Sequence, residues 1–354
     1  MELFTRVDIP ASNIRIDYTS RIAFFGSCFA DNISAQFAAR KFGVFANPFG
    51  TVYNPISIAG QIKAIADGKV FGESDVFQDA RGLQDVSGKQ DARGKQDARG
   101  PWYSWDAHGS LSGSTREECI AKLNNAATRT REFLNQADVV FITLGTAFVY
   151  YLKDGGSSSV GNAHGRAVAN CHRQDPTLFN RRMISVEEAA QALESIVQDL
   201  HRVNPEAHIV FTVSPLRHMG DGAHNNTLSK ATLQLAVNNV INKVTTVPSA
   251  NSGTLPVSYF PSYEIVMDEL RDYRFYESDM VHLSKTAEEY IFERMAETYC
   301  SEKTRTDIAR VEKFMKMQNH RVADASSPAT LEFARTLSAK AAELEAQIPG
   351  LDLH

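Results

Sequence analysis

The sequence predicts an α/β protein, a three-layer α/β/α sandwich with a mostly parallel sheet, followed by a C-terminal helical tail. Three apolar stretches have the character of buried strands: 22–26, 137–146 and 208–213. Each of them ends at a glycine or runs into a serine. Segments with a helical spacing of apolar residues separate them, and strands that alternate with helices at this spacing form parallel sheets covered on both faces.

The other elements follow along the chain. Residues 1–20 are expected to form a lead-in arm, 47–55 a loop with two Asn-Pro turn signals, and 256–260 a short strand. The stretch 153–180 has no regular period, which predicts a long loop. Helices are expected over about 29–41, 56–66, 115–135, 185–203, 226–244 and 284–299, and in the tail 301–354, which breaks at 324–328.

A six-residue tandem repeat interrupts this pattern, with units that begin at Gln78, Gln84, Gln90 and Gln96. The units carry glycine and charge and have little to bury, so an exposed, mobile loop without chemistry is expected over about 72–100. The domain organisation predicted is one domain over 1–300 with this insertion, and a helical extension over 301–354. The last helix is expected to pack on the body or on another subunit of a homo-oligomer.

Composition limits the function. The chain has 354 residues, 43% of them hydrophobic, and a formal net charge of -5, with no basic tract that would bind nucleic acid. No apolar run is long enough to span a bilayer, and the first residues lack a signal-peptide pattern. Four scattered cysteines show no disulfide or zinc rhythm, which indicates a reduced, cytoplasmic protein without a metal or other cofactor.

The first buried strand ends at Gly26 and is followed by Ser27 and Cys28, which begin a helix. A strand that turns at a glycine into a helix presents a nucleophile at the carboxyl edge of the sheet, where open α/β sheets bind ligands. Near the end of the domain, Asp279 stands three residues before His282. An aspartate there can fix the imidazole by a hydrogen bond, and the histidine then serves as general base for the nucleophile.

Several long motifs resemble those of the GSCFA family. They are Gly26–Ala30 (Gly-Ser-Cys-Phe-Ala), Asn47–Pro55, Phe141–Ala147, Val168–His172, Ser214–His218 and Tyr259–Glu264. The resemblance covers roughly residues 20–300. The GSCFA family is in turn similar to the SGNH/GDSL hydrolases, which implies a flavodoxin-like sandwich and acyl-ester chemistry, with the nucleophile turn first in the chain and Asp-x-x-His last.

The resemblance also implies site residues. Aligned on Gly-Asp-Ser-Leu, the chain has Cys28 in place of the wider family's serine, and Ser27 is the alternative nucleophile. A thiol at a helix N-terminus beside His282 is expected to have a lowered pKa. The wider family's Gly-x-Asn turn reads Gly145-Thr146-Ala147 here, so the asparagine donor to the oxyanion is missing. Gly145 and Thr146 of this turn stay candidates for the oxyanion site, together with backbone donors at Cys28 and Gly50, and Asn54, His218 or Asn170 are candidates to replace the lost amide.

The remaining candidates concern the substrate. Trp102, Trp105 and His108 either wall a substrate pocket or plug the core. Arg217 either recognises an anionic or carbohydrate group or anchors its loop, and His172 is expected to be a loop histidine beside the site. The function predicted is acyl-ester hydrolysis or acyl transfer on a small molecule or carbohydrate, acetyl esters above all. The alternative is a saccharide- or acyl-binding module with no covalent step.

Overall fold

The computed structural model describes residues 5–78, 100–153, 165–246, 256–319 and 328–353. A five-stranded parallel sheet forms its centre, in the order β10-β9-β5-β1-β2. The strands are β1 (Arg21–Gly26), β2 (Gly43–Ala46), β5 (Val139–Leu144), β9 (His208–Val213) and β10 (Val257–Tyr259). Numbered along the chain, this is the order 2-1-3-4-5 of flavodoxin-like sheets. The predicted parallel sheet is confirmed, and β2 is a strand that the sequence pattern did not indicate.

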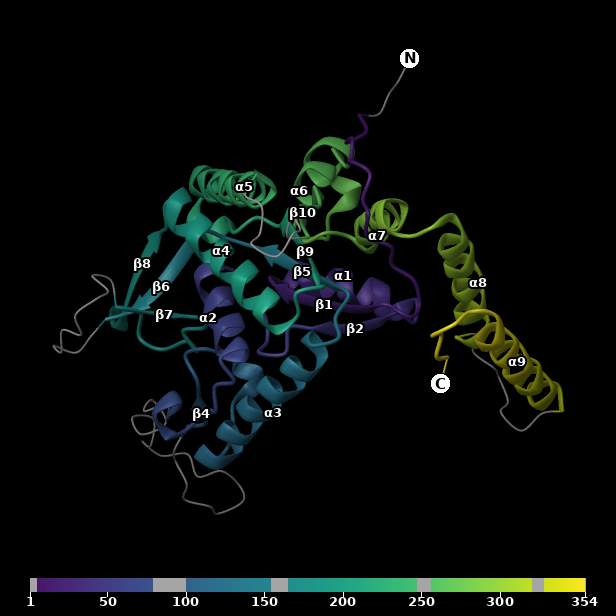
Figure 1. The fold of residues 1–354 in the computed structure, drawn as a ribbon, viewed down its shortest axis with the longest axis horizontal. Helices are drawn as coiled ribbons and strands as arrows, with labels where there is room; N and C mark the ends of the chain where they lie inside the picture. The colour runs from purple at the N-terminus through teal and green to yellow at the C-terminus, as the bar shows by residue number, and fades with distance from the viewer. Residues whose placement is uncertain (1–4, 79–99, 154–164, 247–255, 320–327, 354) are drawn as a thin grey trace.

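Helices cover both faces of this sheet, which confirms the three-layer sandwich (Figure 1). Side chains alternate along β1: Ala23 and Phe25 enter one core, and Ile22 and Phe24 enter the other. The first core is covered by α2 (Pro55–Ala66), α3 (Arg116–Leu134), α4 (Val186–Val203) and α5 (Ala223–Thr246), and the second by α1 (Cys28–Ala39) and α7 (Lys285–Tyr299).

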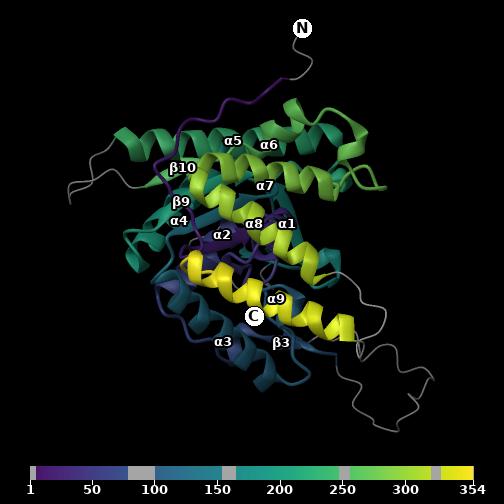
Figure 2. The ribbon, with the colours of Figure 1, turned by 90° about the vertical axis from the view of Figure 1, so that its right-hand side faces the viewer.

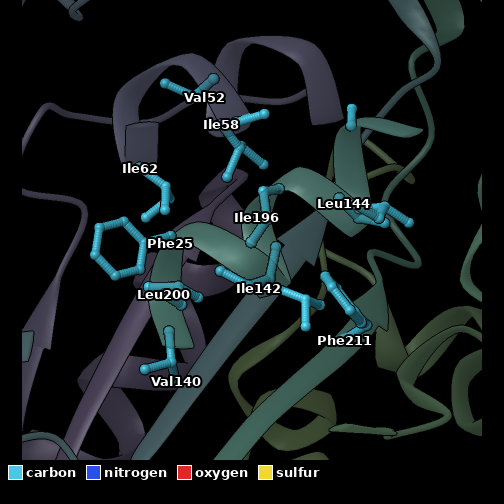
Figure 3. Close-up of a cluster of buried hydrophobic side chains, with 14 of the residues drawn as sticks. Phe25, Val52, Ile58, Ile62, Val140, Ile142, Leu144, Ile196, Leu200 and Phe211 are labelled. Carbon is cyan, nitrogen blue, oxygen red and sulfur yellow. The ribbon is translucent and has the colours of Figure 1, made fainter. Parts of the chain in front are cut away.

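The first core joins sheet and helices through branched and aromatic side chains. Figure 3 shows Phe25, Val140 and Ile142 of the sheet beside Ile62 of α2 and Leu200 of α4. All five are at most 2% exposed. Burial of each such side chain contributes about 1.5–3 kcal/mol, so this packing holds β1 and β5 in place against α2 and α4.

Local sequence sets where the helices begin. The Ser185 hydroxyl accepts the N–H of Glu188, and the Glu188 carboxylate accepts the N–H of Ser185, which forms a capping box at the start of α4. Asn54 caps α2, with Pro55 at its first position. Ser284 caps α7 in the same manner. The predicted helices therefore agree with the observed ones to within a few residues.

One predicted loop is wrong. Within 153–180, β7 (Arg166–Val168) and the start of β8 (Phe179–Met183) pair antiparallel with β6 (Phe148–Leu152) in a small separate sheet. A second pair, β3 (Phe77–Gln78) and β4 (Trp102–Tyr103), flanks the repeat. The repeat itself, predicted to be mobile, lies outside the described residues over 79–99.

The C-terminal tail is helical, as predicted, with α8 (Glu302–Gln318) and α9 (Pro328–Gln347). Both helices lie to one side of the sandwich (Figure 1), and Figure 2 shows them facing the viewer. The chain end packs back on the body, because Ile348, Leu351 and Leu353 are buried in the same cluster as Tyr18. The predicted break at 324–328 falls mostly outside the described residues. No helix in the described ranges has the length and apolar character to cross a membrane.

Candidate active site

The turn after β1 positions the candidate nucleophile. Gly26 has φ 129°, and the Ser27 N–H donates to the Thr143 carbonyl of β5 at 3.1 Å. Ser27 is then the N-cap of α1, and Cys28 is its first residue. The side chain at 28 therefore stands at the carboxyl edge between β1 and β5, where the strand order of the sheet reverses.

Accessibility separates the two candidate nucleophiles. Ser27 is 1% exposed, and its hydroxyl has no hydrogen-bond partner among the described residues. Cys28 is partly exposed. Because an acyl ester must reach the attacking atom, this burial favours Cys28 over Ser27.

The thiol is not activated by the helix alone. Burial raises the pKa of Cys28, and the Asp31 carboxylate raises it further. The N–H groups of Phe29 and Cys28 and the Lys230 ammonium lower the pKa of the thiol, but these effects are smaller than the increase. The expected lowering of the pKa is therefore wrong, because desolvation outweighs the helix N-terminus.

Asp31 also holds the neighbouring loop. Its carboxylate accepts the Asn47 amide at 2.7 Å and the Thr51 hydroxyl at 2.9 Å, while the Asn47 side-chain oxygen accepts the Gly26 N–H at 2.8 Å. These bonds tie the 47–51 loop to the turn that carries Cys28. Neither Asp31 nor this role of Asn47 was predicted from the sequence.

Asp279 and His282 form the predicted pair. Asp279 Oδ2 lies 2.5 Å from His282 Nδ1, and Oδ1 accepts the N–H groups of Val281 and His282 at 2.9 Å. These bonds lower the pKa of Asp279 to about 2. Both side chains are about half exposed. The carboxylate thus stays ionised and holds the ring so that Nε2 is left for another partner.

Helix packing brings this pair to the end of the sheet that carries Cys28. Glu288 interacts with Asn32 and lies 3.4 Å from Gln36, while Phe292 lies 4.0 Å from the Arg40 guanidinium. Later residues of α1 therefore contact later residues of α7. The two helices run in the same direction, and their first turns lie side by side. Cys28 begins α1, and the loop with His282 leads directly into α7. No hydrogen bond joins Cys28 to His282 in the described part of the chain.

Three of the predicted oxyanion residues, Gly50, Gly145 and Thr146, have backbone N–H groups that are already engaged. The Gly50 N–H donates to the Asn47 carbonyl at 2.7 Å, and the N–H groups of Gly145 and Thr146 both donate to the Tyr53 carbonyl, at 2.8 and 3.0 Å. Using them for an oxyanion would require these turns to open. The N–H groups of Cys28 and Phe29 act on the thiol itself, because they lower the pKa of Cys28.

The sequence model of the GSCFA family matches residues 21–295. The chain belongs to the GSCFA family. The search of curated proteins gives no match. Among solved structures, the chain is similar to a carbohydrate esterase family 3 crystal structure from Talaromyces cellulolyticus. That similarity has 9% identity and a TM-score of 0.29, and covers 83% of this chain and 99% of the esterase chain. At these values the esterase's activity is not transferred to this chain.

In this GSCFA protein, two of the predicted substrate residues line the same edge. The His218 ring meets Tyr53 edge-on at 5.3 Å, and burial lowers the pKa of His218. Arg217 lies 3.8 Å from the Met267 sulfur, and its charge acts on Lys230 and Tyr276. Asn54 is buried, and its side-chain oxygen is used to cap α2.

Two other predicted substrate residues, Trp105 and His172, belong to an aromatic cluster with Phe77 and Tyr103. Trp105 stacks on Phe77 at 3.7 Å, and His172 stacks on Tyr103 at 4.4 Å. His172 is 6% exposed, with Nε2 at 2.7 Å from the Ser104 carbonyl. The contacts of Trp105 and His172 therefore fit the plug interpretation.

Three further predicted residues have local partners. Trp102 lies 4.7 Å from the Arg116 guanidinium. The Asn170 side chain accepts the His172 N–H at 2.7 Å. His108 is exposed, accepts the Ser110 N–H, and packs so closely on the 47–51 loop that a Cβ at Gly50 would lie 2.2 Å from its own. The described residues include no group of three or more His, Cys, Asp or Glu arranged to hold a metal ion.

Lys230 is a further residue of the site that the sequence did not predict. This residue of α5 is 1% exposed and donates to the carbonyls of Gly145 and Ser214 at 2.6 and 2.7 Å. A lysine in an amphipathic helix is ordinarily a surface residue. No signal in the sequence marks this one as buried, because only the packing of α5 on the sheet edge reveals it.

Proposed function

We propose that this protein hydrolyses or transfers acyl groups, with acetyl esters of small molecules or carbohydrates as substrates. Cys28 is the nucleophile, His282 the general base and Asp279 the residue that orients His282. The observation that carries this proposal is the Asp279–His282 pair, with its 2.5 Å contact, on the loop whose helix runs beside the one that Cys28 begins.

The chemistry proceeds in two balanced steps. Cys28 Sγ attacks the acyl carbon while its proton moves to His282 Nε2, and the proton then passes to the departing alkoxide. Water or an acceptor hydroxyl attacks the resulting thioester, giving its proton to His282, and the thiol is restored as it takes that proton back. Hydrolysis and acyl transfer differ only in that second nucleophile.

Turnover of acetyl esters tests the proposal. Cys28→Ala should abolish turnover, and His282→Ala should lower it about 10²–10⁴-fold, since that is the usual contribution of a positioned base. The exposed His224 on α5 provides a matched control, His224→Ala, which should leave turnover unchanged. Full activity in Cys28→Ala and in Ser27→Ala would refute the assignment.

A binding module without a covalent step is the second candidate. It is favoured by the engaged N–H groups of Gly50, Gly145 and Thr146 and by the raised pKa of Cys28. Iodoacetamide at pH 7 separates the two. Selective modification of Cys28 that is lost in His282→Ala supports the enzyme, whereas slow labelling that ignores His282 supports the module.

A further inference from the structure

Lys230 joins two turns at the carboxyl edge of the sheet. Its Nζ donates to the Gly145 carbonyl, after β5, at 2.6 Å and to the Ser214 carbonyl, after β9, at 2.7 Å. The Gly145 turn in turn lies against the nucleophile turn, since a Cβ at Gly145 would sit 3.2 Å from the Ser27 Cβ. The ammonium therefore binds the Gly145 turn, and that turn packs directly on Ser27 at the start of α1.

The charge of Lys230 has no carboxylate to balance it. Among the residues that the structure describes, the polar partners of its Nζ are the Gly145 and Ser214 carbonyls, and no Asp or Glu forms an ion pair with it. An ammonium has three protons, and the two carbonyls take two of them. An unpaired buried cation is costly, and an anion placed beside it would offset that cost.

We propose that this anion belongs to the nucleophile turn, and that protonated Lys230 stabilises the Cys28 thiolate and the oxyanion of its acyl adduct. The inference deepens the proposed function and depends on it in taking Cys28 as the nucleophile. The asparagine that would donate to the oxyanion after Gly145 is missing, and Lys230 could replace it because its ammonium is a charged donor at that same turn.

The groups around Cys28 oppose one another. Asp31 of α1 raises the pKa of the thiol, and the partly buried Tyr53 lies within electrostatic range of the same thiol. Burial lowers the pKa of Lys230 to about 7, a Cys28 thiolate raises it, and Arg217 lowers it. His218 is also within reach of the Lys230 charge, which helps to keep that imidazole neutral. Lys230 is thus poised to change its charge with the state of Cys28.

The test measures the alkylation rate of Cys28 by iodoacetamide against pH, read peptide by peptide. Lys230→Met keeps the length of the side chain without its charge and should slow alkylation of Cys28 about tenfold at pH 7, equivalent to one unit of pKa. Lys230→Gln should behave alike. Cys171 is the internal control: burial raises its pKa to about 11, and it should react equally in all variants. An unchanged Cys28 profile in a folded Lys230→Met would overturn the proposal.

A second measurement leaves position 230 intact and decides the matter even where those variants fail to fold. Cys28 is alkylated with iodoacetate, which adds a negative charge, or with iodoacetamide, which adds none. The pKa of Lys230, followed by NMR of ¹³C-labelled lysine, should be at least one unit higher in the carboxymethylated protein. Equal values would overturn the proposal. Neither measurement requires turnover, so a protein that cleaves no ester would refute the proposed function without deciding this one.

Discussion

Replacing Gly26 by alanine should damage the fold at the point where it creates the site. Gly26 has φ 129°, and an added Cβ would lie 2.0 Å from the Thr143 carbonyl oxygen. That oxygen cannot move away freely, because it accepts the Ser27 N–H where the neighbouring strands β1 and β5 end. A strained backbone conformation costs about 1–3 kcal/mol and forced displacement in a packed core about 1–3 more. We therefore expect Gly26→Ala to lose about 2–6 kcal/mol of stability.

Urea unfolding followed by circular dichroism measures this loss, with Gly60→Ala as the matched control. Gly60 lies inside α2, and a Cβ there would meet nothing within 4 Å. Alanine stabilises such a helix position by about 0.5–1 kcal/mol. The two identical substitutions should thus have effects of opposite sign. A loss of less than about 1 kcal/mol in Gly26→Ala would show that β1 can shift against β5, and the rigid-turn argument would fail.

Three further changes have defined outcomes. Asp31→Asn removes the anion beside Cys28, so the pKa of the thiol should fall and alkylation at pH 7 should accelerate, as measured by peptide mass spectrometry. Glu269→Gln weakens the buried pairing with Arg294 at 3.3 Å and the bonds from Val7 N–H and Tyr290, and should cost about 3 kcal/mol in urea unfolding. Burial lowers the pKa of His208 to about 4 from 6.5 when unfolded, so stability should fall between pH 6.5 and 4. After a discount for its solvent contact this loss is about 2 kcal/mol, and His208→Asn should remove it; an unchanged pH profile would contradict the assignment.

The layers of the fold could be predicted because their signals are local. The apolar runs before Gly26, Gly145 and Ser214 are long enough to be recognised as buried strands, and caps such as Ser185 and Ser284 mark where helices begin. The short strands in 153–180 escaped prediction. Their pairing with β6 depends on contacts between distant segments, and three to five residues carry too little pattern.

The candidate site also has a part that local sequence predicts and a part that depends on distant segments. Asp279 and His282 are three residues apart, so their pairing follows from local geometry, and the structure has it. Whether Cys28 and His282 act together stays a prediction, although the parallel packing of α1 and α7 brings their loops to one end of the sheet. The homo-oligomer also remains a prediction, since the end of the tail packs on the body of the same chain.

By itself, the sequence determined the long buried strands, the main helices between them, the Gly26 turn and the Asp279–His282 pair, because each depends on neighbours a few residues away. Only the tertiary structure decided that Ser27 is buried and that the N–H groups of Gly50 and Gly145 are already hydrogen-bonded to backbone carbonyls. It also decided that Lys230 is buried at the edge of the sheet. Burial and charge balance depend on what packs against a residue from elsewhere in the chain. For that reason the pKa of Cys28 is raised by its surroundings, although its place at a helix start had suggested the opposite.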